Sequence, residues 1–145
     1  MSIFNSINVS ATALTAEKTR IDIIAKNMAN ANTTRSTGGM PYRRQMAVFE
    51  ENKPNFSDYL NRHNNKIEGK GVKISKIVED ESPFRLVYEP GHPDADENGY
   101  VKMPNVNTMK EMVDLISAQR SYDANITVMN ASKSMLMKAL EIGRR

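Results

Sequence analysis

The 145-residue chain has no cysteine and no long apolar run. Without cysteine it has no disulfides, thiolate metal ligands or cysteine nucleophiles. No segment approaches the roughly 18 to 20 apolar residues of a transmembrane helix, so no membrane span is expected. Asn and Ser side chains interrupt the apolar positions near the N-terminus, and we therefore expect no cleaved signal peptide.

The chain also lacks a concentrated charge and the glycine-rich signatures of nucleotide-binding enzymes. Its 20 Lys and Arg residues against 17 Asp and Glu residues give a net charge of +3. These charges are spread along the chain without a basic stripe, which argues against nucleic acid as a partner. No phosphate-binding loop or nucleophile elbow occurs. We therefore expect no enzyme, no catalytic residue, no cofactor and no small-molecule substrate.

Helix-breaking residues are missing from both ends of the chain. All six prolines and six of the seven glycines fall in residues 38–104. Both ends are therefore free to form long helices. The predicted fold class is α+β, with residues 1–34 and 105–145 forming one discontinuous helical domain. Residues 35–104 form a β-rich middle module with a flexible loop around residues 52–71.

Apolar residues recur every seven positions in the N-terminal segment, at Ile7, Leu14, Ile21 and Met28. This spacing predicts an amphipathic helix with a coiled-coil seam. We expect it to end near residues 30–33, where Asn and Thr side chains compete for backbone hydrogen bonds.

The C-terminal segment carries the same rhythm for about four heptads. Its seam positions are Met112, Leu115, Gln119, Tyr122, Ile126, Met129, Lys133, Leu136 and Leu140. Residues 108–142 contain no breaker, which predicts a helix of about 50 Å at about 1.5 Å per residue. Thr108 and Glu111 have the spacing of a capping box, and Gly143 suits the helix end. The two terminal helices are expected to pair as an antiparallel, coiled-coil-like bundle.

Between the helices the apolar period changes to two. Residues 42–49, 72–78, 83–88 and 100–103 are predicted strands. The dipeptide Asn98-Gly99 indicates a hairpin, because it tolerates the positive φ angles of a type I′ turn. The pair Arg43-Arg44 is interpreted as part of a solvated strand edge.

Few residues here could bind a metal. His63 and His92 lie in polar loop sequences without a ligand at helical spacing, so we interpret them as solvated histidines. Asp94, Asp96 and Asn98 reproduce the opening of a calcium loop. Its twelfth position is Asn105 instead of Glu, which favours a polar turn over a calcium site. No metal site is therefore predicted.

Two helices of this length cannot be covered by a middle of about 75 residues, so their apolar stripes need each other or neighbouring subunits. Contacts that repeat between subunits without closing generate helical assemblies. The residues thus favour a multi-subunit assembly.

Several segments resemble bacterial flagellar rod and hook proteins, a family of axial structural proteins. They are residues 27–34 (NMANANTT), 104–107 (PNVN), 118–122 (AQRSY) and 92–96 (HPDAD), together with Asn125. Within that family, these segments most resemble the proximal-rod members. The resemblance implies a structural subunit of the basal body in the cell envelope, exported by the flagellar type III apparatus and required for motility. The implied partners are other rod proteins, ring and export-gate components, and further copies of the chain.

The resemblance also assigns roles to single residues. Asn27, Asn30 and Thr33 would end the first helix and satisfy backbone groups at the turn. Gln119, Arg120 and Asn125 would set the register between neighbours. Leu14, Ile21 and Met28 of the first helix would pack against Leu115, Tyr122, Ile126, Met129, Leu136 and Leu140. A soluble export chaperone or adaptor that presents its Met-rich helix to a client is the alternative.

Overall fold

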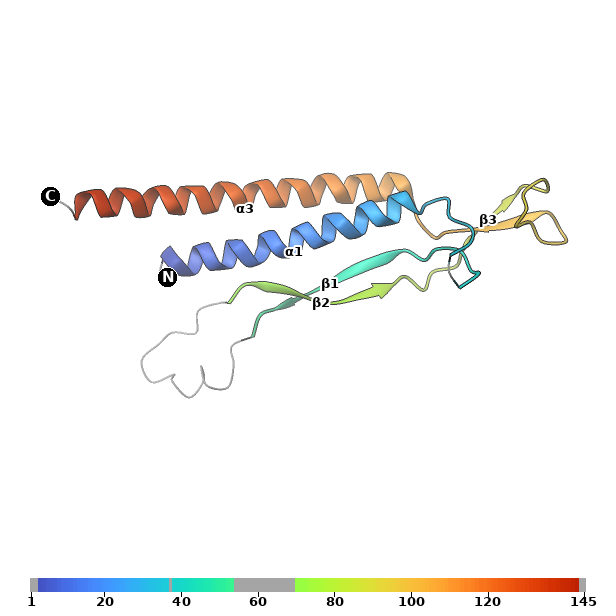
Figure 1. Ribbon diagram of the computed structural model, residues 1–145, viewed down its shortest axis with the longest axis horizontal. Helices are drawn as coiled ribbons and strands as arrows, with labels where there is room; N and C mark the ends of the chain where they lie inside the picture. Colours follow the sequence, from blue (N-terminus) through green and yellow to red (C-terminus); the bar gives the residue numbers. More distant parts are fainter. Residues whose placement is uncertain (1–2, 37, 54–69, 144–145) are drawn as a thin grey trace.

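The computed structural model describes residues 3–36, 38–53 and 70–143, which form an elongated molecule (Figure 1). The elements in chain order are α1 (Ile3–Ala29), β1 (Gln45–Glu51), β2 (Val72–Glu79), β3 (Arg85–Tyr88), β4 (Tyr100–Met103) and α3 (Thr108–Ile142). Two long terminal helices with short antiparallel strands between them confirm the predicted α+β class. α1 lies between α3 on one side and the β1–β2 hairpin on the other (Figure 1).

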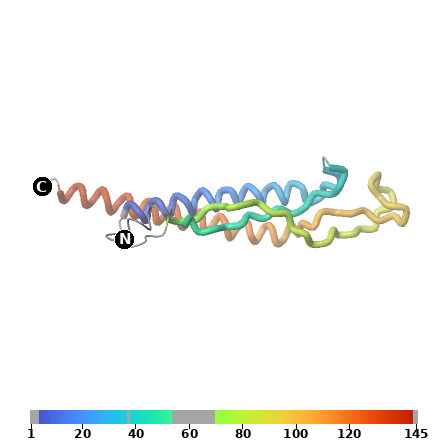
Figure 2. Tube along the Cα trace, turned by 90° about the horizontal axis from the view of Figure 1, so that it is seen from below, coloured from blue at the N-terminus to red at the C-terminus, as the bar shows by residue number. Residues whose placement is uncertain are grey.

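The two helices run antiparallel (Figures 1 and 2), and two contacts between them define their register. Near the start of α1, the hydroxyl of Ser6 lies 3.4 Å from that of Ser132. Near its end, the amide of Asn27 donates to Glu111 at 3.0 Å. These contacts are 21 residues apart on both helices, which is three heptads. Knobs-into-holes packing of the coiled-coil type stays a prediction.

The face of α3 toward α1 is a heptad row in which small or polar residues alternate with large ones. Glu111, Ala118 and Ser132 are buried, with exposed fractions of 0%, 0% and 3%. The partly buried residues in the same alternating spacing of three and four are Leu115, Tyr122, Asn125, Met129 and Leu136. Small side chains at Ala118 and Ser132 allow the helices to approach each other closely.

Four residues of the predicted packing row lie on the face of α3 toward α1, and their packing against the apolar row of α1 stays a prediction. Leu115, Tyr122, Met129 and Leu136 belong to the buried face, and Ile126 is partly buried beside it. Met112, Gln119 and Lys133, the alternate positions of the predicted seam, are exposed in the subunit, and the residue before each of them is buried. Their contacts with a neighbouring subunit stay a prediction. The true row was missed because it contains Glu111 and Ser132, which hydrophobicity alone does not mark as buried. Leu140 is 72% exposed, since α3 extends past the start of α1.

On α1, too, the residues that bond to the other helix lie one position before members of the predicted row. The predicted residues Ile7, Leu14, Ile21 and Met28 are only partly buried. The residues that reach α3 through hydrogen bonds, Ser6 and Asn27, each precede a member of that row by one position. The buried residues of the helix are Ser10, Ala16, Ile23, Ile24 and Asn27.

The start of α3 is capped by Asn107, not by Thr108. The Asn107 side chain accepts hydrogen bonds from the backbone N–H groups of Met109 and Lys110. A side-chain cap of this kind stabilises a helix by about 1 kcal/mol. The predicted capping box is therefore wrong, and Glu111 is free for another role. At the other end, the Gly143 N–H donates to the Ala139 carbonyl at 3.1 Å.

The β1–β2 hairpin lies along α1 and contacts it closely at the end where residues 52–71 connect the two strands. β1 and β2 pair antiparallel from Gln45↔Glu79 to Glu51↔Val72, with a bulge at Val48/Phe49. Gly71 has φ +82° and lies against Thr12 of α1, whose hydroxyl accepts from the Val72 N–H at 3.2 Å. Most of the predicted flexible loop, including His63, lies outside the described residues.

β3 and β4 form a second antiparallel hairpin that projects from the end of the molecule (Figure 1). Its last pair is Tyr88↔Tyr100, so the connection comprises residues 89–99 and the predicted two-residue turn is wrong. Gly99 has φ +79°, whereas no described residue other than glycine, Asn98 included, has a positive φ. The Asp96 carboxylate instead organises the loop by accepting from the Asn98 and Tyr100 N–H groups.

Candidate assembly site

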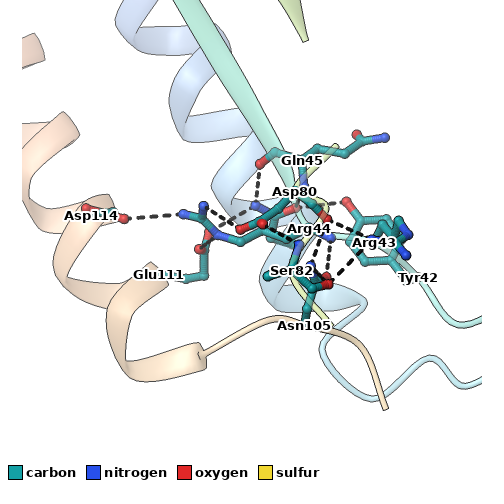
Figure 3. A network of polar contacts seen from close by, with 10 residues as sticks. Tyr42, Arg43, Arg44, Gln45, Asp80, Ser82, Asn105, Glu111 and Asp114 are labelled. Atoms are coloured by element: carbon teal, nitrogen blue, oxygen red, sulfur yellow. Dashed lines mark hydrogen bonds and ion pairs between the residues drawn. The ribbon is translucent and has the colours of Figure 1, made fainter. Parts of the chain in front are cut away.

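A buried carboxylate joins the two helices to the β1–β2 hairpin (Figure 3). Glu111, in the first turn of α3, has no exposed surface. One of its oxygens accepts from Arg44 Nε at 2.7 Å, and the other accepts from the Asn27 amide at 3.0 Å. A buried charge is tolerated when an opposite charge and hydrogen bonds compensate for lost hydration. We call Asn27, Arg44, Asp80, Asn105 and Glu111 the junction network.

Asn27 links α1 to the chain entering β1. Its amide also donates to the Gln45 carbonyl at 2.8 Å, and its carbonyl oxygen accepts from the Gln45 N–H at 2.9 Å. The Tyr42 hydroxyl donates to the same oxygen at 2.9 Å. Asn27 is 1% exposed. Its side chain therefore replaces a missing strand neighbour for the Gln45 backbone.

Arg44 connects the remaining members of the junction network (Figure 3). Its guanidinium lies 3.7 Å from Asp80 and 3.6 Å from Asp114. Its backbone N–H donates to Asn105, whose amide donates to the Asp80 carbonyl. The arginine side chain is only 14% exposed, so interpreting this basic pair as a solvated edge is wrong for Arg44.

Two pKa values reflect this environment. Burial raises the pKa of Tyr42 above its ordinary value of 10.0, and the charges of Glu111 and Glu79 raise it further. The Tyr42 hydroxyl thus stays a donor to Asn27. Hydrogen bonds from the Ser82 backbone and side chain lower the pKa of Asp80, and Arg44 adds to this effect.

The polar atoms of the junction network bond to each other and to the adjacent residues Tyr42, Gln45 and Ser82. Both Glu111 oxygens accept hydrogen bonds from side chains, which makes this carboxylate a joint between elements.

The residues that resemble the start of a calcium loop bond to protein groups. In the loop after β3, Asp94 accepts a hydrogen bond from the Thr34 hydroxyl and forms an ion pair with Arg35 at 2.8 Å. His92 Nδ1 accepts from the Asp94 N–H at 3.0 Å. Among the described residues, no group of three or more His, Asp or Glu side chains could hold a metal ion.

The other predicted site residues lie at two places. At the end of α1, the Asn30 amide donates to the Lys26 carbonyl, and Thr33 donates to the Asn30 side chain. On α3, Gln119 and Arg120 are exposed, while the Asn125 amide donates to the Ser121 carbonyl at 2.9 Å. Contacts of these residues with a neighbouring subunit stay predictions.

Opposite its buried face, the first half of α3 exposes apolar side chains. Met109, Met112, Val113 and Ile116 form this outer stripe, with exposed fractions between 46% and 74%. Their spacing of three and four places them on one side of the helix. A continuous exposed apolar surface is typical of a protein interface.

Comparisons with known proteins match both helices and nearly the whole chain. Two family models match, "Flagella basal body rod protein" over residues 7–35 and "Flagellar basal body rod FlgEFG protein C-terminal" over residues 97–142. The flagellar basal-body rod protein FlgC of Bacillus subtilis is 53% identical over 99% of this chain and 100% of its own length. FlgC of Borreliella burgdorferi is 49% identical over 98% of both chains. FlgC of Salmonella typhimurium is 42% identical over 99% of this chain and 100% of its own.

The chain belongs to the FlgC family of flagellar basal-body rod proteins. It is therefore a structural rod subunit, as the resemblance predicted. The two family models cover most of α1 with the turn after it, and β4 with α3. These parts carry Asn27, Glu111 and the outer stripe. Neither described helix contains enough continuous apolar sequence to cross a membrane.

Sequence reasoning missed two important residues of this FlgC-family subunit. Glu111 was assigned to a cap and Arg44 to a solvent-facing edge. A signal for Glu111 was present, because it precedes Ala118 by seven residues and Ser132 by twenty-one on a helix with heptad spacing. No comparable local pattern marked Arg44, whose partners are Asp80, Glu111 and Asp114.

Proposed function

We propose that the chain is a proximal-rod subunit that the flagellar type III apparatus exports without a cleaved signal, and that it polymerises through α1 and α3. In this role it joins other rod proteins, ring and export-gate components and further copies of itself, and it is required for motility. The observation that carries the proposal is the outer stripe on a helix whose opposite face is already covered by α1.

The energetics support contacts between subunits along this stripe. Burial of apolar surface is worth about 25 cal/mol per Å², so four large side chains contribute several kcal/mol once a neighbour covers them. The junction network fixes the first turn of α3 against α1 and β1. The stripe that begins beside it is thereby presented on a rigid support, which lowers the entropy cost of assembly.

A pair of α3 substitutions tests this role. Ile116→Glu places a charge in the middle of the outer stripe, whereas Ser117→Glu places the same charge at the next exposed position. Ile116→Glu should leave the free energy of unfolding within about 0.5 kcal/mol of wild type, because the site is on the surface. It should also abolish recovery of the chain in purified basal bodies and swimming in soft agar.

Ser117→Glu should retain both basal-body recovery and swimming. Secretion of each variant into the medium through the flagellar export route should be unchanged, since the substitutions act after export. Normal basal-body recovery of Ile116→Glu would refute assembly through the outer stripe. Loss of secretion when the type III apparatus is intact would refute the proposed export route.

A further inference from the structure

The projecting β3–β4 hairpin exposes a small aromatic surface. Leu86, Tyr88 and Tyr100 are 60%, 63% and 43% exposed. Tyr88 and Tyr100 are a cross-strand pair with ring centroids 5.3 Å apart, and Leu86 is two residues before Tyr88, so the three share one face. The hairpin packs against no other described helix or strand. The hairpin is held through its loop, where Asp94 contacts Thr34 and Arg35, and its aromatic face is left open to a neighbour.

The opposite end of the molecule exposes the last two turns of α3. Ser6 faces Ser132, so α1 begins opposite about residue 135 and the rest of α3 extends beyond it (Figures 1 and 2). Met135, Met137, Leu140 and Ile142 are between 55% and 77% exposed in this segment. We call residues 135–142 the α3 tail.

The two ends carry opposite charge. Residues 88–100 contain Glu89, Asp94, Asp96 and Glu97 and no Lys or Arg, a formal charge of −4. Arg35 compensates Asp94, whereas no described Lys or Arg forms an ion pair with the other three. Residues 133–145 contain Lys133, Lys138, Arg144 and Arg145 against Glu141, a formal charge of +3, and Lys138 pairs with Glu141 at 2.8 Å within the helix. Complementary charge steers association and selects register.

We propose that the aromatic face of the β3–β4 hairpin receives the α3 tail of a second copy of the chain. The two surfaces lie at opposite ends of the long axis, so the contact is head to tail and leaves one surface of each kind free (Figure 1). Such a heterologous contact propagates an open assembly. This inference deepens the proposed function, on which it rests, by naming a second contact besides the outer stripe.

Cysteine cross-linking tests the contact directly, because the chain has no cysteine of its own. Full-length Tyr88→Cys and Leu140→Cys chains are mixed and oxidised, and the disulfide heterodimer is measured on non-reducing gels. The control mixture replaces Tyr88→Cys with Lys76→Cys, an exposed position on β2. The hairpin–tail heterodimer should form at least tenfold faster than the control. Salt at 1 M should slow it towards the control rate, because the charges are exposed.

Further variants make the result decisive. Leu86→Cys replaces Tyr88→Cys if circular dichroism shows that the latter is unfolded. Glu89→Lys with Glu97→Lys should slow cross-linking, and Lys133→Glu with Lys138→Glu in the partner should restore it. A heterodimer rate equal to the control overturns the proposal, as does faster hairpin-to-hairpin than hairpin-to-tail cross-linking. If the chain is recovered in basal bodies but this cross-link is absent, the head-to-tail contact fails and the rod role stands. If the chain is absent from basal bodies, the rod role fails.

Discussion

At the scale of single residues, the structure depends on a carboxylate in an unusual position. Glu111 is wholly buried in the first turn of α3, where both its oxygens accept hydrogen bonds. Arg44, which directly precedes β1, donates to one oxygen, and Asn27 of α1 donates to the other. One side chain thus fixes the relative positions of three elements that are far apart in the sequence.

Removing this carboxylate should be far more costly than removing that of Asp114, which is partly exposed. Glu111→Ala leaves Arg44 without its closest partner and leaves the Asn27 amide short of an acceptor. We expect a loss of about 3 to 5 kcal/mol in the free energy of unfolding, typical of breaking a buried ion pair. Asp114→Ala removes a contact at 3.6 Å from the same arginine, with a carboxylate 32% exposed, and should cost less than about 1 kcal/mol.

Urea unfolding of the two variants, followed by circular dichroism, measures both losses. Equal losses for Glu111→Ala and Asp114→Ala would contradict the role of Glu111 as the joint. Heptad spacing to Ala118 and Ser132 could have placed Glu111 on the buried face. It could not reveal Glu111 as the joint, because the partners that compensate for its burial, Arg44 and Asn27, are 67 and 84 residues away along the chain. Local spacing only suggested a cap, whereas Asn107 provides it.

At the scale of elements, the position of the β1–β2 hairpin depends on a glycine. Gly71 has φ +82°, and a Cβ at this position would collide with Thr12 Oγ1. Gly71→Ala therefore combines backbone strain with a steric clash against α1. It should reduce the free energy of unfolding by more than about 1 kcal/mol. Gly91→Ala, at an open loop position with no atom within 4 Å, should be nearly neutral.

Hydrogen exchange distinguishes loss of hairpin docking from global unfolding. In Gly71→Ala, backbone amides of β1 and β2 should lose protection before those of the α1–α3 pair. Protection of the hairpin equal to that of wild type would show that the Gly71–Thr12 contact does not hold it.

The helices and strands themselves were largely predictable, because their periodicity is local. The absence of breakers and the heptad spacing indicated both long helices, and α3 has the bounds 108–142 that the sequence suggested. The face that α3 buries was harder to identify. The rows beginning at Glu111 and at Met112 share every second member and are offset by one position at the others. The row with Glu111 is the buried one, and its partners on α1 and near β1 are not evident from local spacing.

At the scale of the whole molecule, the buried and exposed apolar surfaces have different roles. The face of α3 toward α1 stabilises the subunit, whereas the outer stripe and the α3 tail are exposed, and we propose that neighbouring subunits cover them. The three exposed surfaces lie on a side and at both ends of an elongated body. This distribution suits a subunit with several neighbours in a helical wall.

A density map of purified basal bodies at side-chain resolution tests the central claim most directly. We expect the chain to lie in the proximal rod as an antiparallel α1–α3 pair, with Met109, Val113 and Ile116 buried against adjacent subunits. A rod that lacks the chain, or a subunit whose outer stripe faces solvent in the assembled rod, would contradict it.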